Sequence, residues 1–190
     1  VLVDEAITLN PITFYGQSKK AGEEVALKYS AFLPVKVIRP PVVYGPREEN
    51  LYTFFKLVKK GWGLQIGRSS KKLSLIYVAD LVRAMMEVCD PRFSQKKTYF
   101  VTDGETYSWQ EVAKTAADKM NVSIKALKIP ESILVPIAIF FEALAMFSAK
   151  PALFDRQRMI DIRQSCWTAS SENFFRDFDF TPQFKLTTGL

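Results

Sequence analysis

A tyrosine and a lysine near the start of the chain, Tyr15 and Lys19, have the types and the spacing of an acid/base pair. In a helix, residues four apart lie on one face, so the phenol and the ammonium would be neighbours. A free phenol has a pKa of about 10, and a neighbouring ammonium favours the phenolate form. Such a pair could move a proton to or from a carbinol oxygen. Lys20, five residues on, would turn away from Tyr15, and a solvated helix surface is the alternative interpretation.

The composition narrows the available chemistry. The 190-residue chain contains no histidine, which excludes a Ser-His-Asp triad and the commonest transition-metal ligand, and no metal site is expected. Its two cysteines, Cys89 and Cys166, form no disulfide framework, which favours a reducing cytoplasm. The hydrophobic fraction of 48% indicates a globular core. The net charge of +6 fits an anionic ligand or a membrane surface, and the basic runs lack the interleaved aromatic residues that would indicate nucleic acid.

The elements that must position the pair alternate between helix and strand. Helical spacing of apolar residues predicts helices, and β-branched runs predict strands. Ser108 and Glu111 have the spacing of a capping box at the start of one helix. In chain order we expect a helix over 13–32, a strand over 34–40, a loop over 41–48, a helix over 51–61, a helix over 78–90, a strand and turn over 97–104, a helix over 108–120 and a strand over 123–130. This alternation predicts an α/β architecture.

The rest of the chain has a different pattern. No strand is predicted after residue 130, and the last residues, 186–190, look like the opening of a helix. The apolar run 132–149 approaches the length of a spanning helix, but Pro136 and Glu142 interrupt it. We interpret it as a helix buried in a lobe. Membrane contact through this run is left open but not favoured, and a membrane-crossing helix is disfavoured.

Three segments, in this order and at suitable separation, resemble the extended short-chain dehydrogenase/reductase superfamily, which includes the NAD-dependent epimerases and dehydratases. They are LNPITFYGQSKKAGEE (9–24), VKVIRPPVVYGPRE (35–48) and LIYVADLVRAMMEV (75–88). The resemblance implies the C-terminal part of a Rossmann-like NAD(P)-binding domain over residues 1–128, interleaved with segments of a substrate lobe. It implies a mostly helical substrate lobe over residues 129–190.

The resemblance also implies a role for each residue of these motifs. Tyr15 would be the catalytic acid/base, and Lys19 would hydrogen-bond the nicotinamide ribose, so both would also bind the cofactor, NAD or NADP. The turn after the strand would lie against the nicotinamide, and it consists of Pro40, Pro41, Val42 and Val43. This placement agrees with the rule that ligands bind outside the carboxyl ends of strands in open α/β sheets.

Three further positions are expected to act less directly. Arg47 stands where a polar or anionic group of the substrate could be met, and a solvated loop arginine is the alternative. Asp80 is expected to cap or position its helix. Many relatives with nucleotide-sugar substrates carry a histidine at the place that Ile76 occupies here.

The C-terminal sequence resembles the 3β-hydroxysteroid dehydrogenase and dihydroflavonol reductase-like branch of this superfamily. The resemblance rests on Ile129-Pro130, Glu142, Trp167 and DFDFTP (177–182), in which Asp179 stands where glycine is usual. It implies hydride transfer between nicotinamide and a hydroxyl or ketone carbon of an apolar, steroid- or flavonoid-like small molecule. A nucleotide-sugar epimerase or dehydratase and a non-catalytic NAD(P)-sensing protein are the alternatives.

Two parts of a complete active site are missing from the sequence. No G-x-x-G-x-x-G turn occurs among the eight glycines, and only fourteen residues precede Tyr15, where a substrate-orienting serine or threonine would be expected further upstream. The chain is therefore expected to be a fragment without the glycine-rich half, with weak NAD(P) binding and no turnover on its own. A homodimer through the helix that carries Tyr15 is left open.

Overall fold

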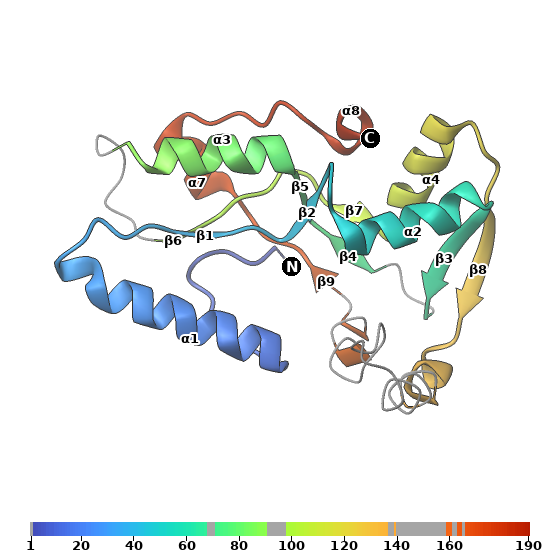
Figure 1. Ribbon diagram of the computed structural model, residues 1–190, viewed down its shortest axis with the longest axis horizontal. Coiled ribbons are helices and arrows are strands. Elements are labelled where there is room, and N and C mark those ends of the chain that lie inside the picture. The colour runs from blue at the N-terminus through green and yellow to red at the C-terminus, as the bar shows by residue number, and fades with distance from the viewer. Residues whose placement is uncertain are drawn as a thin grey trace.

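The chain folds around several short strands and the helices that pack on them (Figure 1). The computed structural model describes residues 2–67, 71–90, 98–136, 139, 159–160, 163–164 and 166–190. Within these residues the helices are α1 (Phe14–Lys28), η1 (Tyr29–Ala31), α2 (Glu49–Lys59), α3 (Val78–Val88), α4 (Trp109–Met120), η2 (Glu131–Ile133), α7 (Glu172–Phe178) and α8 (Leu186–Gly189). The strands are β1 (Val37–Arg39), β2 (Val42–Tyr44), β3 (Trp62–Ile66), β4 (Lys72–Leu73), β5 (Leu75–Tyr77), β6 (Thr98–Phe100), β7 (Tyr107–Ser108), β8 (Lys125–Ile129) and β9 (Cys166–Trp167).

Parallel pairing dominates the strands. β1 pairs with β6, β2 with β5 and β3 with β8, and all three pairs are parallel. A further sheet has the order β7–β4–β9, in which β4 is antiparallel to β7 and parallel to β9. Parallel strands need crossover connections, which helices usually supply. The α/β class predicted from the sequence is confirmed.

The strand that leads to the predicted cofactor turn is interrupted by two prolines. β1 ends at Arg39 and β2 begins at Val42, so Pro40 and Pro41 separate two strands that pair with different partners. Proline lacks the N–H group that a strand ladder requires. The prediction of a loop over residues 41–48 is wrong for β2, because β-branched and aromatic residues resume a strand as soon as the N–H groups return.

The sequence also fails to predict β3, β4, β5, β7 and β9, and all of these except β3 have only two or three residues. No strand is predicted after residue 130, and β9 corrects this, since it pairs in parallel with β4. Each of these two strands has two residues, which is too short for a period-2 pattern to be recognised. Pairing between distant parts of the chain creates them, so local sequence gives little signal.

The long helices agree with the sequence. α1 and η1 together fill the predicted range 13–32, and α3 and α4 begin and end close to their predicted limits. The capping box of α4 is formed: the Glu111 amide donates to Ser108 Oγ at 3.1 Å, and the Ser108 amide donates to Glu111 Oε2 at 2.6 Å. The hydrogen bond from the Ser108 backbone lowers the pKa of Glu111.

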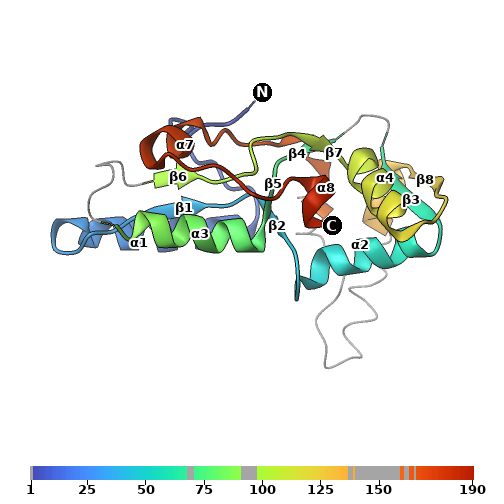
Figure 2. The same ribbon diagram turned by 90° about the horizontal axis from the view of Figure 1, so that it is seen from above.

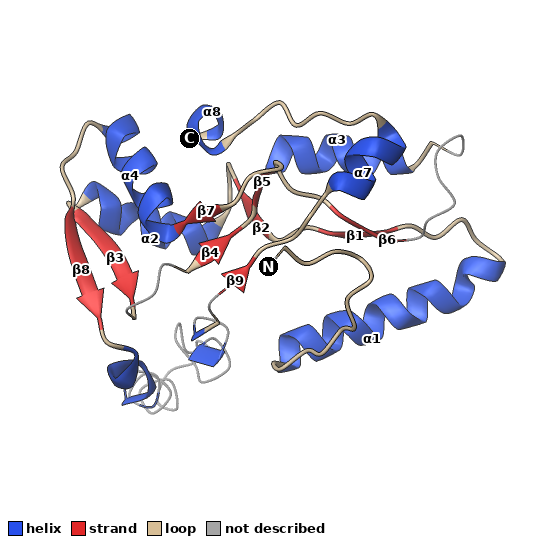
Figure 3. Ribbon diagram, turned by 180° about the vertical axis from the view of Figure 1, so that it is seen from behind, coloured by secondary structure: helices blue, strands red, loops and turns tan. Residues whose placement is uncertain are grey.

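Helices cover both faces of the β1–β6 pair. Figure 1 shows α3 and α7 on one face and α1 on the other, and Figure 2, seen from above, shows α3 in front of α1. On the face that α3 and α7 cover, Tyr99 of β6, Ala84 of α3 and Phe174 of α7 are fully buried in one cluster. A second cluster joins Tyr44 of β2 to Leu186 of α8. The β3–β8 pair lies at the opposite end of the molecule from α1 (Figure 3).

Two segments near the end of the chain return to the α/β body, because α7 packs on β6 and α8 packs beside Tyr44. The predicted division into residues 1–128 and 129–190 stays a prediction. Most of the apolar run 132–149 lies outside the described residues. Within the part of the chain that the structure describes, no helix combines the length and apolarity needed to cross a membrane.

Candidate active site

The helix α1 begins at a well-formed cap that places Tyr15 in its first turn. Thr13, which is 4% exposed, accepts a hydrogen bond on Oγ1 from the Gly16 amide at 3.2 Å. A Cβ atom on Gly16 would lie only 3.0 Å from the Cβ atom of Pro11, so glycine lets the preceding chain pass close to the helix. The sequence PITFYG thus fixes where the helix starts.

Tyr15 and Lys19 lie side by side on α1. The Lys19 ammonium is 5.4 Å from the centroid of the Tyr15 ring, and Tyr15 is 69% exposed. Among the described residues, neither the Tyr15 hydroxyl nor the Lys19 ammonium has a hydrogen-bond or ion-pair partner. Lys20 is engaged elsewhere, because its ammonium donates to the Leu9 carbonyl at 3.3 Å and pairs with Glu24 at 3.8 Å. Of the two lysines, Lys19 is therefore the one that is both adjacent to Tyr15 and free to meet a ligand.

The β1–β2 turn lies at the same end of the helix–strand unit as Tyr15. α1 and β1 run in opposite directions, so the first turn of α1 and the last residue of β1 face the same end (Figures 1 and 3). Pro40 is exposed, and Pro41, Val42 and Val43 are half-buried. The turn therefore sits at the carboxyl end of a parallel strand, where ligands bind in α/β sheets.

Arg47 lies beyond β2 in an unusual backbone conformation. Its φ of 74° is in the left-handed region, which non-glycine residues rarely adopt and which recurs at functional sites. A hollow of about 520 Å³ opens here, and its lining residues are Gly45, Pro46, Arg47, Glu48, Glu49, Leu51, Tyr52 and Phe55. Arg47 is exposed at its rim, so the guanidinium is accessible to an incoming group.

Asp80 positions the end of the chain rather than capping its own helix. The N-cap of α3 is Tyr77, which makes no side-chain cap hydrogen bond. The fully buried Asp80 carboxylate accepts from the amides of Gln183 at 2.9 Å and Phe184 at 2.8 Å, and from Arg83 Nη1 at 2.6 Å. Asp80 therefore ties the C-terminal segment to α3.

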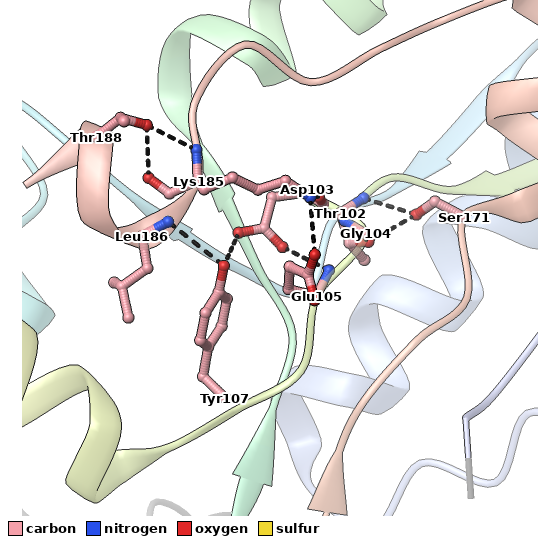
Figure 4. A network of polar contacts seen from close by, with 9 residues as sticks. All are labelled: Thr102, Asp103, Gly104, Glu105, Tyr107, Ser171, Lys185, Leu186 and Thr188. Carbon is pink, nitrogen blue, oxygen red and sulfur yellow. Dashed lines mark hydrogen bonds and ion pairs between the residues drawn. The ribbon is translucent and has the colours of Figure 1, made fainter.

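A second buried carboxylate, Asp103, holds a neighbouring network that the sequence does not predict (Figure 4). Asp103 accepts from the Tyr107 hydroxyl at 2.7 Å and from the Glu105 amide at 2.9 Å, while the Lys185 ammonium donates to its backbone carbonyl at 2.5 Å. Burial raises the pKa of Asp103 despite these hydrogen bonds. The sequence offers one signal, since an aspartate directly before Gly104 is typical of a turn.

Tyr107, which is half-buried, and Tyr44, which is buried, differ in how their hydroxyl groups are satisfied. The Tyr107 hydroxyl donates to Asp103 and accepts from the Leu186 amide at 3.4 Å, and burial raises its pKa. The Tyr44 hydroxyl is buried without a hydrogen-bond partner among the described residues, and burial raises its pKa as well. Tyr44 is held instead by ring packing, with its centroid 5.4 Å from that of Tyr77.

The position of Asp179 explains why glycine is usual there. Asp179 is the C-cap of α7 and has a φ of 47°, in the left-handed region. Glycine adopts this conformation without strain, and aspartate is among the few other residues that tolerate it. The departure from the usual residue therefore preserves the helix end.

A family model described as the RmlD substrate binding domain matches residues 4–138 of the chain, which is more than half of its length. The matched range contains α1, the β1–β2 turn, Arg47, Asp80 and Asp103. The family match thus covers every site residue that the sequence predicts.

Two known proteins are similar in sequence. "Ceramide reductase" of Caulobacter vibrioides is 22% identical over 172 residues, which are 90% of this chain and 54% of that protein. "UDP-glucose 4-epimerase" of Vibrio cholerae is 31% identical over 120 residues, which are 61% of this chain and 37% of that protein. The match to the reductase therefore extends over more of the chain.

The fold is shared with solved structures of the same superfamily. The UDP-glucose 4-epimerase of Thermus thermophilus, solved as a complex with NAD, matches all of this chain with a TM-score of 0.70 at 19% identity. The match covers 55% of that structure. The α/β body therefore shares the Rossmann-like fold of this structure, and the chain spans about half the length of this structure and of the reductase.

Proposed function

The chain belongs to the RmlD substrate binding domain family, and from this premise we propose that it is the C-terminal part of an NAD(P)-dependent oxidoreductase. The reaction proposed is hydride transfer between nicotinamide and a hydroxyl or ketone carbon. The observation that carries the proposal is the placement of Tyr15 beside Lys19 in the first turn of a capped helix, with both reactive groups accessible and unpaired among the described residues.

The residues present fit a bound nicotinamide cofactor, which would supply or accept the hydride. Among the described residues, none accepts a hydrogen bond from the Lys19 ammonium, so its three N–H donors would be available for ribose hydroxyls. The Tyr15 hydroxyl would exchange a proton with the carbinol or carbonyl oxygen of the substrate, with the Lys19 ammonium beside its ring. Pro40, Pro41 and the backbone of β2 would provide the surface on which the nicotinamide rests.

For the substrate we propose an apolar alcohol or ketone. The similarity to a ceramide reductase over 90% of the chain supports this, since ceramide is a lipid. Ile76 supports it as well, because it is fully buried in the core where nucleotide-sugar relatives often carry a histidine. A steroid- or flavonoid-like ketone stays one candidate within this class. Arg47 would meet a polar group of the substrate at the rim of the hollow.

A nucleotide-sugar epimerase or dehydratase is the second candidate. It is favoured by the 31% identity to a UDP-glucose 4-epimerase over 61% of the chain. The same pair, Tyr15 and Lys19, would serve either reaction. A non-catalytic NAD(P) sensor is disfavoured, because a sensor has no need of the acid/base tyrosine. A homodimer through α1, a membrane contact and a cytoplasmic location stay predictions.

Two measurements test the proposal. Calorimetric titration of the 190-residue chain with NAD(H) and NADP(H) should show only weak binding, because the sequence contains no glycine-rich turn. Micromolar binding would show that the cofactor site is complete within this chain. A substrate screen on the longer polypeptide should then find turnover with ceramide-, steroid- or flavonoid-like ketones, whereas turnover with nucleotide sugars alone would favour the second candidate.

A further inference from the structure

A bidentate ion pair joins the helix that carries the reactive pair to the sheet. Arg39 Nε donates to Glu23 Oε2 at 2.9 Å, and Arg39 Nη2 donates to Glu23 Oε1 at 2.5 Å. The side chains are only 17% and 14% exposed, respectively. Two parallel hydrogen bonds from a planar guanidinium fix the direction of approach as well as the distance, which a single contact does not.

Apolar packing gives α1 little support of its own. None of the residues of α1, all of which the structure describes, is buried. Glu23 lies two turns after Tyr15 and one turn after Lys19, at the i, i+4, i+8 spacing of residues on one side of a helix. The ion pair therefore holds α1 by the same side that presents the reactive groups.

The other end of the ion pair lies next to the proposed nicotinamide surface. Arg39 is the last residue of β1, and Pro40 and Pro41 follow it directly. Its guanidinium lies 5.5 Å from the centroid of the Phe100 ring on the paired strand, which restricts its movement. Arg39 Nη1 is buried without a hydrogen-bond partner among the described residues, so Glu23 is the carboxylate that compensates this charge.

We propose that Glu23 and Arg39 are positioning residues, whose ion pair sets the placement of Tyr15 and Lys19 relative to the β1–β2 turn. The proposal rests on the proposed function, because it assigns to the turn the nicotinamide and to α1 the proton transfer. Catalytic groups must be held to within a fraction of an ångström, and a displacement of about 1 Å can lower the rate by about 100-fold. The sequence alone does not single out this pair, although the i+8 spacing of Glu23 from Tyr15 is a usable signal.

The test compares Glu23→Gln with Glu24→Gln, a matched change on the same helix in an exposed pair with Lys20. In the longer polypeptide, well below its unfolding temperature, Glu23→Gln should lower kcat by about 10-fold to 100-fold and raise the KM for the coenzyme. Glu24→Gln should change neither. The charge-reversed double variant, Glu23→Arg with Arg39→Glu, should recover part of kcat, which a general loss of stability would not allow.

A second readout does not depend on activity. In the 190-residue chain, Glu23→Gln should speed hydrogen exchange of the α1 amides, and Glu24→Gln should leave it unchanged. Unchanged kcat in Glu23→Gln, or α1 exchange that is equal in the two variants, would overturn the positioning role. A different result would contradict the proposed function itself. In that case Tyr15→Phe would retain full activity, whatever the activity of Glu23→Gln.

Discussion

Two polar regions of the molecule have opposite character. One is the pair Tyr15 and Lys19, which we call the α1 stripe, and the other consists of the buried carboxylates of Asp80 and Asp103 near the C-terminal segment. Tyr15 and Lys19 are exposed, and their polar groups have no hydrogen-bond partner among the described residues. Asp80 and Asp103 are fully buried, and each accepts at least two hydrogen bonds from its own chain. Buried polar groups must find hydrogen-bond partners inside the protein, whereas a group that acts on a ligand must keep a donor or acceptor available for it. The difference separates the residues that hold this fold from those that can do chemistry.

The largest effect on stability is expected from Asp80→Ala. The change leaves two backbone amides and Arg83 without their acceptor, and we expect it to lower the free energy of unfolding by about 3 kcal/mol. Asp118→Ala, at an exposed position of α4, should change it by less than about 0.5 kcal/mol. Urea unfolding of both variants is the measurement. Equal effects would remove the distinction between the two regions.

Two Tyr→Phe variants compare a hydroxyl group that has a hydrogen-bond partner with one that has none among the described residues. Tyr107→Phe deprives Asp103 of a donor and should cost about 1–3 kcal/mol of unfolding free energy. Tyr44→Phe removes a buried hydroxyl that has no partner among the described residues, so it should leave the stability unchanged or slightly higher. Thermal and urea unfolding of the two variants would measure this difference in unfolding free energy. A clear loss in Tyr44→Phe would mean that its hydroxyl is satisfied after all.

The smallest expected effect is the contribution of Asp103 to the pH dependence of the unfolding free energy. Burial raises the pKa of Asp103 in the folded state above its ordinary value of 3.8, so the folded chain retains a proton that the unfolded chain loses. The stability from this group is present below that ordinary value and is lost as the pH rises through the folded pKa, by at most about 1.4 kcal/mol per pH unit. Asp103→Asn stays neutral. The stability of the unmodified chain relative to this variant should therefore fall with rising pH in urea titrations, and a rise would contradict the assignment.

The sequence predicts best what depends on neighbours along the chain. The helices follow from apolar spacing and from the Ser108–Glu111 cap, and the reactive pair follows from a four-residue interval. What depends on distant segments is missed. β9 forms because it pairs with β4. Asp80 accepts hydrogen bonds from the amides of Gln183 and Phe184, which are about a hundred residues away in the sequence. No local pattern encodes such contacts.

The central claim is that the α1 stripe carries chemistry and little of the stability. Its most direct test is Tyr15→Phe in the longer polypeptide, with Tyr29→Phe as the control, because Tyr29 is an exposed tyrosine at the other end of the same helical segment. We expect Tyr15→Phe to lower kcat by about 100-fold to 10,000-fold and to change the unfolding free energy by less than about 0.5 kcal/mol. Tyr29→Phe should change neither quantity. Full activity in Tyr15→Phe would contradict the claim.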